Sequence, residues 1–238
     1  MIKLLLSVKN MEEALLALEA GVDIVDLKDP NVGALGALDL HVTERIVRAI
    51  NGRGLLSATV GENHAALDEL IVSIQARAHL GVDIIKIGVS ALFYTADFFT
   101  EMRKLTGAGA KMVAVFFADE AIDFNLLETL QKIGFYGAML DTKTKQFGLL
   151  ELLAQAEINK FVHLCSNLDL ESGLAGSLKA QHIEIVREIN PTYIGFRGGV
   201  CKNFKRESAL SENKVLEAKS MLRQHNKKLR ESAVSLNV

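Results

Sequence analysis

Two lysines and two aspartates stand near the ends of short apolar runs of this sequence: Asp26, Lys28, Lys86 and Asp141. Ionisable groups in such places are costly to bury unless they are paired or used. Buried lysines are scarce and lose their proton readily. A neutral lysine amine can add to a carbonyl carbon to form an imine, or accept a proton from a neighbouring carbon. These residue types therefore indicate a reaction centre built from lysines and aspartates and suited to Schiff-base chemistry.

Each of the four residues also has a structural interpretation. Lys86 could extend its ammonium group to the solvent or end its strand in an ion pair, and Lys28 could pair with Asp29 in a loop. Asp26 and Asp141 could hold the two lysines as counter-ions without reacting. Neighbouring lysines lower one another's pKa, whereas adjacent carboxylates raise it. The sequence alone leaves both interpretations open.

A few further residues are candidates for the same centre. Lys145 follows Asp141 by four residues, and this spacing alone leaves its role open, whereas Lys143 is typical of a polar loop. Glu62 is a weak candidate for a general base and is more typical of a solvated loop, and His163 is more typical of a core. The sequence holds no metal-binding motif, nucleophile elbow, P-loop or dinucleotide fingerprint. We therefore expect neither a metal nor a cofactor.

The apolar runs that carry the four charged residues are near copies of one another. Each run begins at a glycine that is expected to end a helix. Counted from this glycine, Asp26 and Lys86 occupy one position, and Lys28 and Asp141 occupy the position two residues later. A strand alternates its faces with a period of two, so both positions point to the same side. The glycines are Gly21, Gly81 and Gly134.

Apolar runs of strand length alternate with amphipathic helical patterns along the whole chain. Eight such units in a chain of this length predict a single (β/α)8 TIM barrel with its site at the C-terminal ends of the strands. A doubly wound open sheet is the alternative, because periodicity alone does not close a sheet. No linker divides the chain, so residues 1–238 are expected to form one domain. The expected strands are 2–7, 23–28, 55–60, 83–88, 111–117, 136–141, 161–165 and 193–197. The expected helices are 11–20, 41–50, 64–80, 96–105, 123–132, 148–156, 174–189 and 211–229.

Glycine-rich segments follow the last two expected strands. Loops in these places commonly bind phosphate in such barrels, through backbone N–H groups and a helix N-terminus. Residues 171–178 are expected to open a helix, and Arg197 could add a charge-assisted contact. The glycines could also serve only tight turns. The predicted phosphate-binding residues are Gly173, Gly176, Ser177, Arg197, Gly198 and Gly199.

The composition is that of an ordinary globular protein. The 238 residues carry a net charge of −2, which favours neither nucleic acid nor an anionic membrane as a partner. No apolar stretch approaches the roughly 20 residues of a membrane span. Cys165 and Cys201 lie far apart without metal-ligand spacing, as is typical of reduced thiols in a cytoplasmic protein. We expect a cytoplasmic homo-oligomer that binds a small phosphorylated substrate.

Several motifs resemble those of a known family, the (5-formylfuran-3-yl)methyl phosphate synthases, also called 4-(hydroxymethyl)-2-furancarboxaldehyde-phosphate synthases. Most of the chain takes part in the resemblance. The family is similar to class I aldolases in its chemistry and has a (β/α)8 barrel. The motifs are residues 5–14 (LLSVKNMEEA), 21–30 (GVDIVDLKDP), 33–36 (GALG), 57–61 (SATVG), the run around Lys86, 139–142 (MLDT) and 173–178 (GLAGSL).

The resemblance implies a metal-free condensation of two glyceraldehyde 3-phosphate molecules, with release of phosphate and water. The product is a phosphorylated furan aldehyde that feeds the furan of methanofuran-type carriers. Lys28 matches the family's Schiff-base lysine and Lys86 its proton-accepting lysine, and Asp26, Asp141 and Lys145 match further active-site positions. Another class I aldolase acting on a sugar phosphate, or a phosphate-binding barrel without catalysis, are the alternative interpretations.

Overall fold

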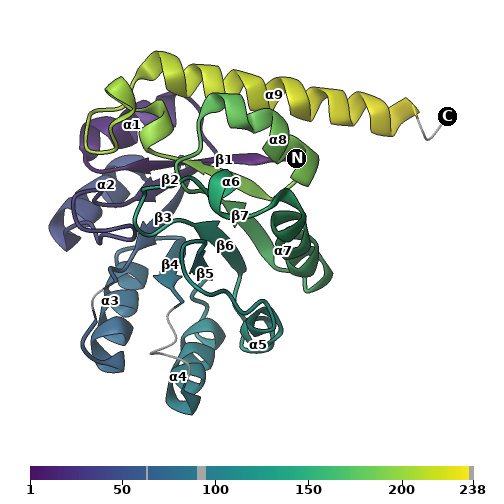
Figure 1. The fold of residues 1–238 in the computed structure, drawn as a ribbon. Helices are drawn as coiled ribbons and strands as arrows, with labels where there is room; N and C mark the ends of the chain where they lie inside the picture. The colour runs from purple at the N-terminus through teal and green to yellow at the C-terminus, as the bar shows by residue number, and fades with distance from the viewer. Residues whose placement is uncertain (63, 90–94, 236–238) are drawn as a thin grey trace.

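Eight parallel strands form a closed barrel in which each strand pairs with its neighbours in sequence order and β8 returns to β1. The computed structural model describes residues 1–62, 64–89 and 95–235 (Figure 1). The expected (β/α)8 barrel is thus confirmed, and the alternative of a doubly wound open sheet is wrong because the sheet is closed. The strands are β1 (Lys3–Val8), β2 (Ile24–Leu27), β3 (Leu55–Thr59), β4 (Ile84–Gly88), β5 (Met112–Phe117), β6 (Gly137–Asp141), β7 (Glu171–Leu174) and β8 (Tyr193–Phe196).

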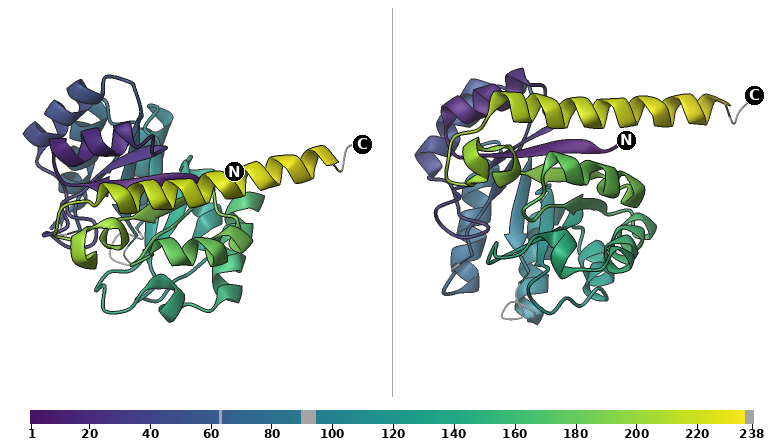
Figure 2. Two further views of the ribbon diagram at one scale, coloured as in Figure 1. Left: turned by 90° about the horizontal axis from the view of Figure 1, so that it is seen from above. Right: turned by 45° about the horizontal axis from the view of Figure 1, so that its top comes forward.

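The helices surround the barrel as an outer layer, and the last of them, α9, runs beside β1 and extends beyond the rest of the molecule (Figure 2). In the part of the chain that the structure describes, no helix is both long and apolar enough to cross a membrane. The α-helices are α1 (Met11–Glu19), α2 (Leu40–Ile50), α3 (Leu67–His79), α4 (Ala96–Gly107), α5 (Leu126–Lys132), α6 (Leu149–Leu152), α7 (Gln155–Asn167), α8 (Ile183–Ile189) and α9 (Glu212–Ser235). Short 3-10 helices are η2 (Ala180–His182), η3 (Gly198–Val200) and η4 (Lys202–Phe204).

The prediction of the seventh strand was wrong. Residues 161–165 lie inside α7, and β7 is the segment Glu171–Leu174, where we expected a helix to begin. The buried residues of α7 are Ile158, Phe161, Val162 and Cys165, whose spacing follows a helical period. The true strand, Glu-Ser-Gly-Leu, is short and lacks the β-branched and aromatic residues that favour strands.

The glycines before β2 and β4 end their helices in the same way. Gly21 has φ +69° and Gly81 has φ +91°, in the left-handed region that only glycine adopts without cost. The next amide reaches back into the helix in both cases, from Val22 N to Ala17 O and from Val82 N to Arg77 O. This Schellman arrangement starts both strands at the same point, so a count from the glycine compares equivalent residues.

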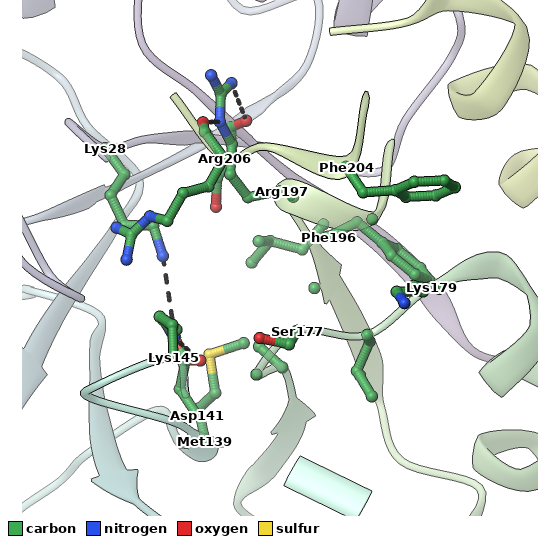
Figure 3. A pocket seen from close by; sticks show the side chains of 18 of the residues that line it. Lys28, Met139, Asp141, Lys145, Ser177, Lys179, Phe196, Arg197, Phe204 and Arg206 are labelled. Atoms are coloured by element: carbon green, nitrogen blue, oxygen red, sulfur yellow. Dashed lines mark hydrogen bonds and ion pairs between the residues drawn. The ribbon is translucent and has the colours of Figure 1, made fainter. Parts of the chain in front are cut away.

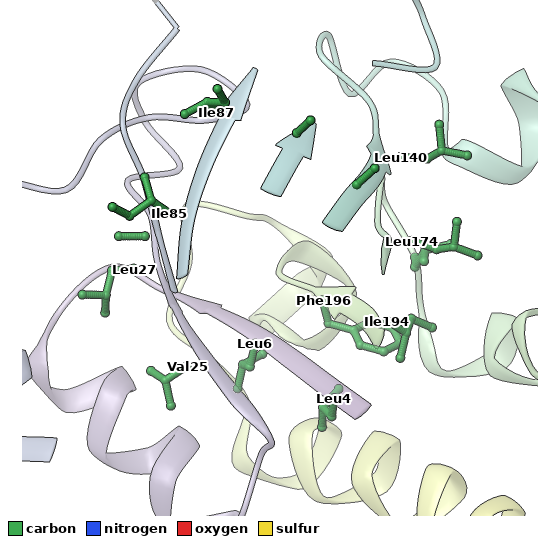
Figure 4. Close-up of a cluster of buried hydrophobic side chains, with 14 of the residues drawn as sticks. Leu4, Leu6, Val25, Leu27, Ile85, Ile87, Leu140, Leu174, Ile194 and Phe196 are labelled. Atoms are coloured by element: carbon green, nitrogen blue, oxygen red, sulfur yellow. The ribbon is translucent and has the colours of Figure 1, made fainter. Parts of the chain in front are cut away.

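Apolar side chains fill two layers. One lies between the strands and the helices and includes Leu4, Leu27, Ile85, Leu140 and Ile194 (Figure 4). The other fills the barrel interior, where Tyr193 packs among smaller apolar residues. Successive strand residues alternate between the two layers, so the charged residues near the strand ends point inward, above the interior layer.

Candidate active site

A cavity of about 280 Å³ opens at the C-terminal ends of the strands. Lys28 directly after β2, Lys86 in β4 and Asp141 in β6 line it, together with the segments that follow β7 and β8 (Figure 3). Three strands that are distant in sequence therefore bring their charged ends to one place. This is the end of the barrel at which enzymes of this architecture hold their active sites.

Asp26 and Lys86 form the more deeply buried ion pair, which we call the inner pair. Lys86 Nζ lies 2.7 Å from Asp26 Oδ1, and Asp26 is fully buried. The hydroxyl groups of Ser57 and Ser7 donate to the two carboxylate oxygens, each at 2.7 Å. Burial would raise the pKa of Asp26, but the charges of Lys86 and Lys28 and the hydrogen bonds from Lys86 and Ser57 outweigh it and lower the pKa. The Asp26 carboxylate is thus an anion that contacts Lys86, Ser7 and Ser57.

Lys28 and Asp141 form the outer pair, which is looser. Lys28 Nζ lies 3.8 Å from Asp141 Oδ2, beyond hydrogen-bond distance. Asp141 Oδ1 instead accepts from Lys145 Nζ at 2.5 Å and from the Thr142 amide at 2.7 Å. Burial would raise the pKa of Asp141, but Lys145 and Lys28 lower it to about 2. Asp141 is therefore an anion that two lysines share.

Lys28 is the amine that this arrangement prepares for reaction. Burial lowers its pKa to about 8, and Lys145 and Lys86 act in the same direction against the pull of Asp141. Roughly a tenth of the Lys28 side chains are then neutral at pH 7, far more than for an ordinary lysine. Within residues 1–62, 64–89 and 95–235, the Lys28 amine has no hydrogen-bond partner, and a neutral amine that faces a cavity in this way can attack a carbonyl carbon.

Lys145 reaches the outer pair from a strained backbone. Its φ is +60°, in the left-handed region that non-glycine residues seldom adopt. Such strain persists where the surrounding structure enforces it, commonly at functional sites. Lys143, two residues earlier, instead pairs with Glu120 at 2.6 Å, away from Asp141, as expected for a loop lysine.

The sequence model of the 4-HFC-P synthase family matches residues 4–219 of the chain. The chain belongs to this family. A (5-formylfuran-3-yl)methyl phosphate synthase of Methanosarcina barkeri is 33% identical over 222 residues, covering 88% of this chain and 95% of the relative. A Methylorubrum extorquens protein, given that name provisionally, is 37% identical and covers 93% of this chain and 92% of its own length.

Solved structures share the fold at much lower identity. The 3-hexulose-6-phosphate synthase of Salmonella typhimurium superposes with a TM-score of 0.66 at 14% identity, covering 94% of this chain and all of that chain. The phosphoribosyl anthranilate isomerase of Thermus thermophilus gives the same TM-score at 12% identity and covers 94% and 99%. This likeness concerns the barrel alone. Membership of the synthase family rests on the sequence matches.

Two of the residues predicted to bind phosphate make contacts within the protein: Gly173 with the Tyr193 ring, and Arg197 with hydrogen-bond acceptors. Gly173 lies within β7, and a Cβ atom there would come within 2.2 Å of the Tyr193 ring, so its small size makes room for that ring. Arg197 donates all five of its guanidinium N–H groups inside the protein. The acceptors are both carboxylate oxygens of Glu13 and the carbonyl oxygens of Ser7, Arg206 and Ser208. Phosphate binding by Arg197 stays a prediction, and it would require Arg197 to give up one of these acceptors.

The other four candidates lie where the segments after β7 and β8 meet, at the cavity wall. A Cβ atom on Gly199 would come within 2.0 Å of the Leu178 carbonyl oxygen, so only glycine allows this approach. Gly176 has φ +103° and Ser177 has φ +54°. Among the described residues, no acceptor is paired with the N–H groups of Gly176, Ser177, Gly198 or Gly199. These amides are free to bind an anion, but their binding of phosphate stays a prediction.

Some residues of the site were missed in the sequence. Ser7 and Ser57 hold Asp26, and the shared pattern Leu-Leu-Ser in two apolar strands was the signal for them. Glu62, considered as a base, accepts the Leu35 amide and braces the loop that follows Lys28. In the described ranges, no group of three or more His, Cys, Asp or Glu residues is placed to hold a metal ion.

Proposed function

We propose that the protein condenses two glyceraldehyde 3-phosphate molecules to (5-formylfuran-3-yl)methyl phosphate through an imine on Lys28, in the biosynthesis of a methanofuran-type carrier. The observation that carries this proposal is the state of Lys28. Its pKa is lowered to about 8, its Nζ has no hydrogen-bond partner in the part of the chain that the structure describes, and it faces the cavity beside an ionised carboxylate. A Schiff-base enzyme needs these properties in its nucleophile.

The charge of the cavity supports the binding of two substrate molecules that carry one phosphate group each. Seven basic side chains and two acidic ones line it, although the chain as a whole carries a net charge of −2. The basic residues are Lys28, Lys86, Lys145, Lys179, Arg197, Lys205 and Arg206, and the acidic residues are Asp141 and Glu207. A concentration of one sign of charge in a cleft attracts ligands of the opposite sign.

The outer pair would carry the first half of the reaction. The neutral Lys28 amine adds to the aldehyde carbon of one triose phosphate, and water leaves as the imine forms. The protonated imine carries a positive charge that Asp141, with its low pKa, stabilises from 3.8 Å. The imine makes the neighbouring C–H bond acidic, and loss of that proton gives an enamine. The enamine carbon then attacks the aldehyde carbon of the second triose phosphate, whose oxygen takes up a proton to become a hydroxyl group. Addition of water to the imine later breaks its bond to Lys28 and frees the amine.

The inner pair would carry the proton transfers of the second half. Loss of phosphate and water from the condensed intermediate requires protons to be supplied and removed. Lys86 lines the cavity, so we assign these transfers to its amine. Asp26, held by Ser7 and Ser57, keeps the Lys86 side chain in place and balances its charge.

The test is to give the protein glyceraldehyde 3-phosphate alone. We expect a furan chromophore, a product with the mass of the furan phosphate, and, after borohydride reduction, a covalent adduct on the peptide that contains Lys28. An adduct without a furan product would indicate a class I aldolase of another specificity. If neither an adduct nor a furan product forms, the protein is a phosphate-binding barrel without this catalysis. A furan product without an adduct would refute the imine mechanism.

A further inference from the structure

The segment that joins β8 to α9 covers one side of the cavity and carries two arginines in contrasting states. Arg197 begins it and is bonded throughout, chiefly to Glu13 of α1. Two of its N–H groups bind carbonyl oxygens further along the segment, those of Arg206 and Ser208. The Glu13–Arg197 pair therefore holds this segment in a fixed shape over the site.

Arg206 is the arginine whose N–H groups remain available. Its side chain is 21% exposed and lines the cavity. Among the described residues, its one hydrogen-bond acceptor is the Gly33 carbonyl oxygen at 2.6 Å, and Glu207 lies 3.9 Å from its Nε. Gly33 belongs to the loop that follows Lys28, so Arg206 extends toward the β2 side of the cavity (Figure 3). Of its five N–H groups, four have no hydrogen-bond acceptor there.

The backbone before Arg206 is strained. Asn203 and Phe204 have φ values of +55° and +56°, and a left-handed conformation is uncommon for a residue as bulky as phenylalanine. Lys214 Nζ lies 3.3 Å from the centre of the Phe204 ring and Lys179 Nζ lies 5.5 Å from it. These cation–π contacts help to hold the ring in place. Consecutive left-handed residues beside a cavity point to a conformation kept for function.

We propose that Arg206 binds one of the two phosphate groups of the substrates and that the Glu13–Arg197 pair positions it; this proposal rests on the proposed function. The guanidinium group presents paired N–H groups whose geometry matches two phosphate oxygens. The free amides near Gly176 and Gly199 lie in the segments after β7 and β8, whereas Arg206 extends to the β2 side. The cavity thus has an anion site on either side of the reacting carbons.

The experiment compares Arg206→Ala and Arg206→Lys with Lys202→Ala, a matched control on the same segment whose side chain is exposed and outside the cavity lining. Borohydride trapping at Lys28 is measured against the concentration of glyceraldehyde 3-phosphate and, separately, of glyceraldehyde, which has no phosphate. Arg206→Ala should raise the concentration of the phosphorylated substrate needed for half-maximal trapping about ten- to a hundredfold. Trapping with glyceraldehyde should be unchanged. The concentration needed by Arg206→Lys should lie between those of the alanine variant and the unchanged protein. Lys202→Ala should need the same concentration as the unchanged protein.

If Arg206→Ala weakens trapping equally with both aldehydes, the proposal is refuted, because the whole site is then disturbed. An unchanged concentration of the phosphorylated substrate for half-maximal trapping would also refute it. Binding of inorganic phosphate, measured by calorimetry on the same variants, separates this proposal from the proposed function. If the unchanged protein binds phosphate, Arg206→Ala weakens that binding, and no imine or furan forms, then the phosphate site stands and the proposed reaction fails.

Discussion

The inner and outer pairs are built from the same two residue types and differ in how tightly they are held. In the inner pair, the charged atoms are 2.7 Å apart and two serines complete the shell of Asp26. In the outer pair, the amine stands 3.8 Å from a carboxylate that Lys145 and a backbone amide already occupy. We infer that the pKa of a buried lysine falls when its carboxylate is bonded elsewhere, because the lysine is then desolvated without being fully compensated.

Replacement of Lys28 by alanine tests the outer pair and should have the largest effect. We expect furan formation and borohydride trapping to fall to background, because Asp26 holds the amine of Lys86 and Asp141 holds that of Lys145. The fold should persist, since Asp141 keeps Lys145 and the Thr142 amide as partners. Circular dichroism and thermal unfolding check the fold. A variant that turns over at the rate of the unchanged protein would end the assignment of the imine to Lys28.

Replacement of Lys86 by arginine asks whether the inner pair only balances charge. Arginine keeps the positive charge beside Asp26 but does not give up its proton in a protein. We expect furan formation to fall about a hundred- to ten-thousandfold, nearly as far as in Lys86→Ala. Trapping at Lys28 should be retained in the arginine variant, because the outer pair is untouched. Near-normal product formation would mean that Lys86 holds Asp26 and transfers no proton.

Replacement of Arg197 by alanine should act on stability more than on substrate binding. It would leave the buried Glu13 carboxylate without its partner, which typically costs about 3–5 kcal/mol. We expect the melting temperature to fall by about 10 °C or more. The double variant Glu13→Gln/Arg197→Ala should recover part of the lost melting temperature, since glutamine removes the unpaired charge. If the single variant keeps its stability and loses only affinity for the phosphorylated substrate, Arg197 binds phosphate after all.

The sequence predicted that the four charged residues lie at one end of the barrel, because their positions depend on local repeats. Counting from the helix-ending glycines gave Asp26 and Lys86 one strand position and Lys28 and Asp141 another, and the structure adds which side chains pair. A glycine that ends each helix fixes where the next strand begins, so a local signal carries tertiary information. The apolar runs also predicted seven of the eight strands, because strands buried on both faces are continuous apolar runs.

The sequence could not predict what depends on distant partners. Arg197 stands in a glycine-rich segment typical of a phosphate site, but its bonding is decided by Glu13, 184 residues away. Gly173 resembles a loop glycine, yet the Tyr193 ring determines that no side chain fits there. The left-handed conformations of Lys145 and Phe204 carry no signal either, because neither residue type favours them.

The pH dependence of imine formation is the smallest effect that we expect, and it tests most directly how the outer pair differs from the inner pair. In the proposed reaction the neutral form of Lys28 is the nucleophile, and the pKa of Lys28 is about 8. The trapping rate at Lys28 should therefore rise about tenfold per pH unit below 8 and level off above it. If Lys28 titrated like an ordinary exposed lysine, the trapping rate would still be rising at pH 9.

Lys145→Met should move this profile to higher pH. Lys145 is a cation that lowers the pKa of Lys28, so its loss makes the protonated amine less unfavourable. The loss also frees Asp141 from its 2.5 Å contact, and an unshared carboxylate attracts the Lys28 ammonium more strongly. Both effects raise the pKa of Lys28, so trapping at pH 7 should slow while the plateau at high pH stays the same. Lys143→Met, which removes a cation paired with Glu120, is the matched control and should leave the midpoint in place. A midpoint that stays or falls in Lys145→Met would mean that burial alone, without the sharing of Asp141, sets the reactivity of the outer pair.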